Sequence, residues 1–112
     1  METNNNTLTL HRWGKANPIT FSVHKYATNG NLCISMYTNA DGFPEPWSNL
    51  TVNLGVKCKE NCAFIDINNN GYEILDWLVD NKLGRVLPRE KVSGFCIYPE
   101  FEFDMEMIAK YN

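Results

Sequence analysis

Apolar and polar residues alternate along the first half of the chain, which is the pattern of β-strands with one buried face. In the second alternating run, residues such as Ile19 and Phe21 would face inward. The pattern predicts strands over residues 8–13, 19–24, 32–37 and 47–54. The predicted connections are a turn over residues 14–18, a tight Asn-Gly-Asn hairpin turn at residues 29–31, and a loop over residues 39–46 that its two prolines exclude from a sheet interior.

The periodicity changes between Cys62 and Gly84. An apolar run at residues 63–67 predicts another strand, and the Asn-rich residues 68–71 predict a turn that caps a helix. Apolar residues then recur every three to four positions, which predicts one amphipathic helix over residues 72–82. The apolar stripe of this helix consists of Ile74, Leu75, Leu78 and Val79. Gly84 is expected to end the helix in a left-handed conformation.

The last part of the chain is predicted to return to the sheet. Residues 85–93 are expected to form a polar loop, and residues 94–98 a strand that ends at Pro99. Strands followed by one helix and more strand indicate an α+β fold, with a mostly antiparallel sheet of about five to six strands and the main helix (residues 72–82) on one face. We expect a single domain over residues 1–112, in which residues 1–7 are flexible.

Composition narrows the classes of function. The net charge of −3 disfavours general nucleic-acid binding, and no apolar stretch is long enough to span a membrane. We therefore expect a cytoplasmic protein. Charge is unevenly distributed, because residues 41–80 carry two Lys or Arg against seven acids.

The four cysteines and two histidines do not have the spacing of a known site. Cys58 and Cys62 are close in sequence, but zinc sites normally have a second such pair. The stretch Asp66–Gly71 begins like a calcium-binding loop, yet Trp77 stands where a bidentate glutamate is required. We predict no metal, no cofactor and no catalytic residue. A metal-dependent or Cys/His enzyme that uses Cys58, Cys62 and a histidine stays as an alternative.

The most unusual stretch lies near the C-terminus, where acids alternate with apolar residues. On a strand, the period of two would place four carboxylates on one face. These are Glu100, Glu102, Asp104 and Glu106. This row is either the solvated face of an edge strand or a surface that binds a basic partner. A helix over residues 104–111 competes with the strand, because Met105, Ile108 and Ala109 would share one of its faces.

Aromatic residues near turns provide a second candidate surface. Phe43 and Trp47 flank a Pro-Glu-Pro segment that could form a rigid protruding contact. Trp13 and Tyr98 also lie near turns. The alternative is that these rings fold back over the sheet.

The order of several short motifs resembles a family of small uncharacterised proteins encoded by bacteriophages and conjugative elements of Gram-positive bacteria. The matching motifs are Asn-Gly-Asn-Leu at 29–32, Leu-Thr-Val-Asn-Leu at 50–54, Ala-Phe-Ile-Asp-Ile-Asn-Asn at 63–69, Lys-Leu-Gly at 82–84 and Ser-Gly-Phe-Cys-Ile-Tyr-Pro at 93–99, with Phe-Glu-Phe-Asp after it. The resemblance implies an accessory protein of a mobile element in a bacterial cytoplasm. It implies no active site.

These observations lead to one functional hypothesis and two alternatives. The leading hypothesis is a non-enzymatic protein that binds a host protein, in particular a nucleic-acid-handling defence complex of the CRISPR or restriction type, and inhibits it. The expected contact residues are Glu100, Glu102, Asp104, Glu106, Phe43 and Trp47. The alternatives are the small metal-dependent or Cys/His enzyme and a nucleic-acid-binding accessory protein that uses the more basic N-terminal part.

Overall fold

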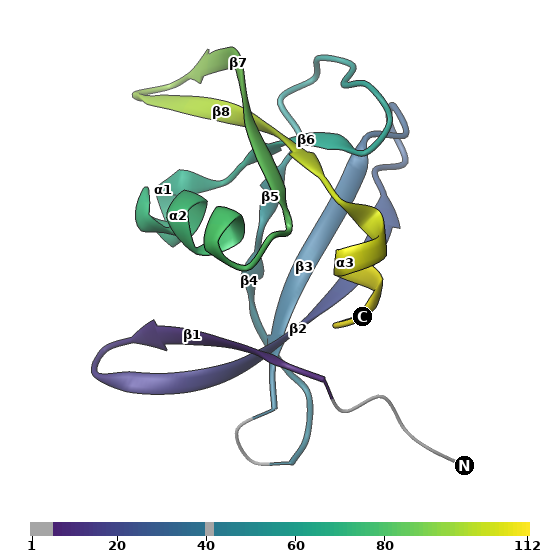
Figure 1. Ribbon diagram of the computed structural model, residues 1–112. Coiled ribbons are helices and arrows are strands. Elements are labelled where there is room, and N and C mark those ends of the chain that lie inside the picture. The colour runs from purple at the N-terminus through teal and green to yellow at the C-terminus, as the bar shows by residue number, and fades with distance from the viewer. Residues whose placement is uncertain (1–5, 40–41) are drawn as a thin grey trace.

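The computed structural model describes residues 6–39 and 42–112, so residues 1–5 of the segment predicted as flexible lie outside the described part. Within these described residues, eight strands form two four-stranded antiparallel sheets, and three short helices accompany them (Figure 1). Sheet A contains, in spatial order, β1 (Leu8–Arg12), β2 (Lys15–Lys25), β3 (Leu32–Thr38) and β4 (Glu45–Asn49). Sheet B contains β5 (Thr51–Val52), β6 (Cys62–Ile65), β8 (Cys96–Phe103) and β7 (Gly84–Ser93). The helices are α1 (Ile67–Asn70), α2 (Glu73–Asp80) and α3 (Met105–Ala109). The α+β class with mostly antiparallel sheet is confirmed, whereas the expectation of five to six strands and one main helix was imprecise, because the described residues form two four-stranded sheets and three short helices.

The division into two sheets occurs at Leu50, inside the predicted strand 47–54. Up to Asn49 the chain pairs with β3, and from Thr51 it pairs with β6. Leu50 is fully buried at the change of partner, and its backbone N–H donates to the Ile34 carbonyl over 2.9 Å. In the sequence, apolar and polar residues keep alternating through this point, although in the structure Thr51 is buried as well as Leu50. The sequence pattern therefore could not reveal that the strand leaves one sheet for the other.

The first hairpin is tighter than predicted. Trp13 and Gly14 have φ values of 52° and 71° and form a two-residue turn, after which β2 begins at Lys15. This geometry corresponds to the left-handed central residues of a hairpin turn. The predicted turn over residues 14–18 is therefore wrong, since residues 15–18 already pair with β1. The inward orientation of Ile19 is confirmed, because its side chain is fully buried.

The predicted helix 72–82 is present as α2, which buries Ile74 and Leu78 completely. The Asn-rich turn before it is itself one helical turn, α1, and the Asp66 carboxylate caps it by accepting the Asn69 N–H over 3.2 Å. The left-handed residue after α2 is Lys82 (φ 61°), not Gly84. Gly84 is needed for a different reason. A Cβ at this position would lie 2.0 Å from the backbone oxygen of Glu102.

The predicted polar loop over residues 85–93 is strand β7, at the edge of sheet B. Most of its side chains are exposed, so the strand has no alternating buried positions to reveal it. A bulge between Val86 and Glu90 contains Pro88. β8 continues through Pro99, where its end was predicted. A proline is tolerated there because β6 pairs with β8 only from Glu100 to Glu102.

One apolar core joins the two sheets and the helices. It includes Ile34 of sheet A, Phe64 and Phe101 of sheet B, Leu78 of α2 and Ile108 of α3, each at most 1% exposed. The C-terminal segment is attached to sheet A through a hydrogen bond of 2.8 Å from the Phe21 N–H to the Tyr111 carbonyl. In the part of the chain that the structure describes, the helices are too short to cross a membrane.

Candidate functional site

The four acids of the C-terminal stretch do not form the predicted row. β8 ends at Phe103, and Asp104 instead caps α3 by accepting the N–H groups of Glu106 and Met107 over 3.1 and 3.3 Å. The competing prediction of a helix within residues 104–111 is confirmed by α3. A change from strand to helix ends the period of two. The prediction of a single carboxylate face is therefore wrong.

The two acids that do lie on β8 are paired within the molecule. The side chain of Glu100 is 7% exposed and receives two hydrogen bonds from the guanidinium of Arg89, at 3.1 and 2.9 Å. Glu102 accepts a hydrogen bond of 2.7 Å from Arg85 Nε. Both arginines come from β7, the strand that was predicted as a loop. Because these carboxylates are neutralised internally, they present no free negative surface to a partner.

The Cys/His alternative is weakened by the state of its thiols. Cys58 and Cys62 are buried, and they form no disulfide. Burial, together with the nearby Glu100, raises the pKa of Cys58 to about 11. Such a thiol is protonated at neutral pH and is a weak nucleophile. His24 lies on β2 and shares a hydrogen bond of 2.8 Å with a neighbouring serine. Within residues 6–39 and 42–112, no three His, Cys, Asp or Glu side chains are grouped as metal ligands would be.

The predicted aromatic residues occupy different environments. Phe43 lies in the loop before β4 with 75% of its surface exposed. Trp47 lies on β4 and is half-buried, and its ring contacts the ring of Trp13 with 5.7 Å between the centroids. Trp13 occupies the β1–β2 turn and is 83% exposed. Trp47 thus supports an exposed tryptophan at the end of a hairpin.

In Figure 1 the end of β1 lies below α1 and α2, and the side chain of Arg12 connects it to both helices. The Arg12 guanidinium donates to the Asn70 carbonyl at the end of α1, and it lies 3.6 Å from the Glu73 carboxylate on α2. Farther along β1, the Thr9 carbonyl accepts the indole N–H of Trp77 over 2.8 Å. The tip that carries Trp13 is therefore held against the helices.

The outer face of α2 is acidic. Glu73, Asp76 and Asp80 are exposed, and their spacing of three and four places them on one side of the helix. We call the combined surface the aromatic–acidic surface, and it consists of Trp13, Trp47, Glu73, Asp76 and Asp80. Of the predicted contact residues, this surface contains only Trp47. Its acids lie on α2 and not in the C-terminal stretch where they were predicted.

The sequence contains part of the signal for this surface. Trp13 stands out as an aromatic residue near a turn, and residues 41–80 have an excess of acids. The contact that joins the two parts links Arg12 to residues about sixty positions later, and no periodicity predicts such a contact. The Arg89–Glu100 pair was missed for a similar reason, because it depends on a strand that was predicted as a loop.

These features define a small α+β protein built from two antiparallel sheets with an exposed aromatic and acidic surface. The family described as "Domain of unknown function (DUF4313)" matches residues 20–112, so the chain belongs to this family. No curated protein and no solved structure matches the chain significantly.

Proposed function

We propose that this chain is a non-enzymatic protein-binding accessory protein of a phage or other mobile element, which acts in the cytoplasm of a bacterial host. Its partner is a host protein that handles nucleic acid in a defence system of the CRISPR or restriction type, and binding inhibits that partner. The resemblance to proteins of bacteriophages and conjugative elements supports the proposed origin. The contact is made by the aromatic–acidic surface.

The exposed indole of Trp13 is the observation that carries this proposal. A tryptophan that is 83% exposed at a hairpin tip loses a large apolar area from water when a partner covers it. Tryptophan is also enriched among the residues that dominate binding energy at protein interfaces. The ring contact with Trp47 and the anchoring of Arg12 hold this tip in one orientation. Less conformational freedom is then lost on binding.

The charge of α2 indicates the chemistry of the partner. Asp76 and Asp80 add exposed negative charge near the exposed tryptophan, whereas Glu73, on the same side of α2, is paired with Arg12. Proteins that hold nucleic acid present clusters of Lys and Arg to the phosphates. This negative charge is complementary to such a cluster, would accelerate association with it, and would compete with the nucleic acid for it.

Affinity capture from a bacterial host tests the proposal, followed by affinity measurement on the purified partner. We expect the wild-type chain to retain a basic, nucleic-acid-binding protein. Trp13→Ala is expected to weaken this binding by about thirtyfold or more, the range of an interface hot spot. Asp76→Lys/Asp80→Lys is expected to weaken it as well, with a smaller dependence on salt.

Phe95→Ala is the matched control, because Phe95 is a fully exposed aromatic residue in the turn between β7 and β8. It should bind the partner like the wild type, and circular dichroism should show that all variants are folded. If the Trp13→Ala and Asp76→Lys/Asp80→Lys variants bind the partner as strongly as the wild type does, the proposed surface is refuted. Retention of the purified wild-type protein on DNA at low salt would instead favour the nucleic-acid-binding alternative.

A further inference from the structure

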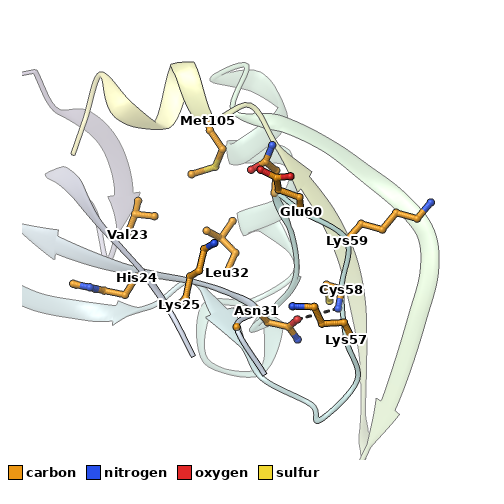
Figure 2. Close-up of a pocket in the computed structure, with 12 residues that line it drawn as sticks. Val23, His24, Lys25, Asn31, Leu32, Lys57, Cys58, Lys59, Glu60 and Met105 are labelled. Carbon is orange, nitrogen blue, oxygen red and sulfur yellow. Dashed lines mark hydrogen bonds between the residues drawn. The ribbon is translucent and has the colours of Figure 1, made fainter. Parts of the chain in front are cut away.

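A cavity of about 750 Å³ lies on another part of the molecule, between the β2–β3 hairpin and the loop that precedes β6. Val23, Leu32 and Met105 provide its apolar lining, and lysines from both walls surround its opening (Figure 2). Small-molecule sites in proteins are commonly about 300–1,000 Å³ in volume and combine an apolar lining with a few polar groups. The cavity has the size and the mixed lining of such a site.

The loop wall of this cavity is held in place although it has no regular secondary structure. The buried side chain of Asn31 donates to the Val56 carbonyl over 2.8 Å and accepts the Cys58 N–H over 3.0 Å. On the other side, Arg89 Nη2 donates to the Lys57 carbonyl over 3.3 Å. These bonds connect the loop to the turn between β2 and β3 and to β7. A ligand would therefore not have to order this wall when it binds.

The charge of the cavity is opposite to that of the whole chain. Lys25, Lys57 and Lys59 line it together with one acid, Glu60, whereas the chain carries a net charge of −3. Each of the three arginines of the sequence lies within 4.0 Å of a carboxylate. Among residues 6–39 and 42–112, none of these three lysines makes such an ion pair. Their positive charge is available to a ligand.

Two of the lysines are oriented toward a common space. Figure 2 shows the side chains of Lys25 and Lys57 approaching the cavity from its two walls, while Lys59 extends away. Lys57 Nζ donates one hydrogen bond, of 2.8 Å, to the Asn29 carbonyl. An ammonium group has three donors, so two of those on Lys57 can contact an anion.

We infer that this cavity binds a small organic anion, with its phosphate or carboxylate group between Lys25 and Lys57 and its apolar part on Val23, Leu32 and Met105. The cavity is far larger than an inorganic phosphate, so the ligand has a body about the size of a mononucleotide or a bicyclic aromatic acid. Lysine is a common phosphate ligand that acts as a point charge, and it pairs with carboxylates in the same way.

Titration of the ¹⁵N-labelled full chain, followed by NMR, tests the inference. The probes are adenosine 5′-monophosphate, 2-naphthoate and the neutral adenosine. We expect one or both anions to shift the amide signals of residues 23–25, 30–32 and 57–60 in a saturable and salt-sensitive manner. Adenosine should bind at least about fivefold more weakly than its monophosphate, because it lacks the charge. The two anions distinguish a phosphate ligand from a carboxylate ligand, and binding of either supports the inference.

Substitutions of lysines test whether the anion binds in this cavity. Lys25→Gln/Lys57→Gln should weaken anion binding about fivefold or more, since two charge contacts are lost. Lys91→Gln should leave binding unchanged, because Lys91 lies on β7 and does not line this cavity. All these side chains are exposed, and urea unfolding should confirm that the variants are stable. Absence of saturable shifts at millimolar concentrations of both anions would overturn the inference, as would undiminished binding to the double variant.

Discussion

Two arginine–glutamate pairs join β7 to β8, and they should contribute very differently to stability. In the pair of Arg89 and Glu100, the side chains are 43% and 7% exposed. In the pair of Arg85 and Glu102, they are 73% and 43% exposed. Strand, partner type and hydrogen-bond distance are similar. The Glu100 carboxylate is much more buried than that of Glu102, and it accepts two hydrogen bonds from its arginine where Glu102 accepts one.

Replacement of Arg89 by Met would leave the buried Glu100 carboxylate without its cation. Removing one partner of a fully buried pair costs about 3–5 kcal/mol. Because the arginine side chain is 43% exposed, water screens this pair in part, and we expect a loss of about 2–3 kcal/mol. The hydrogen bond to the Lys57 carbonyl and the contact with the Phe64 ring, 5.2 Å from the guanidinium carbon, are lost as well. Arg85→Met should cost at most about 1 kcal/mol, as is usual for exposed pairs.

Urea unfolding at neutral pH measures both variants and also Arg89→Met/Glu100→Leu. The double variant removes the buried charge together with its partner, so it should recover most of the loss caused by Arg89→Met. In a thermal scan Arg89→Met should melt about 8–12 °C below the wild type. Equal losses for Arg85→Met and Arg89→Met would refute the reasoning from burial. A double variant as unstable as Arg89→Met would show that the packing of Arg89, and not the unpaired carboxylate, accounts for its effect.

Two further predictions concern the backbone and the buried thiol. Gly84→Ala should lower the free energy of unfolding in urea by about 3 kcal/mol or more, because its Cβ would lie 2.0 Å from the Glu102 backbone oxygen. Gly94 has a φ of 61° and no atom within 4 Å of an added Cβ, so Gly94→Ala should cost only about 1 kcal/mol. Similar losses for the two variants would contradict the steric explanation. Burial raises the pKa of Cys58 from 9.0 to about 11, so between these pH values the unfolded chain releases a proton that the folded chain keeps. Stability should therefore decrease as the pH rises through this window, and urea midpoints should decrease less for Cys58→Ala; identical pH profiles would contradict the buried position of this thiol.

The parts of the fold that were predicted correctly are those where burial follows a regular period. The alternation around Ile19 predicted β2, and the three-to-four spacing around Ile74 and Leu78 predicted α2. β7 was missed because an exposed edge strand has no such period. The second sheet was missed because Leu50 continues the alternation while the chain changes its partner.

The candidate site was less predictable than the fold, because it depends on contacts between distant segments. Alternation alone suggested that Glu100 and Asp104 share a face, but Arg89 pairs with Glu100, and Asp104 caps α3. Composition did identify Trp47 and the excess of acids before residue 80. Only the folded hairpin, with Arg12 against α1 and α2, brings those features together.

The bulge in β7 affects how neighbouring molecules can associate. An edge strand with unpaired backbone groups can accept a strand from another copy, which leads to polymerisation. In β7 the three residues from Leu87 to Arg89 lie opposite Glu100 alone, and Pro88 among them has no N–H to donate. The outer margin of sheet B is thus irregular at its centre and lacks a donor there. This margin offers no continuous template for a second chain, so the bulge disfavours edge-to-edge pairing at an edge that is otherwise open.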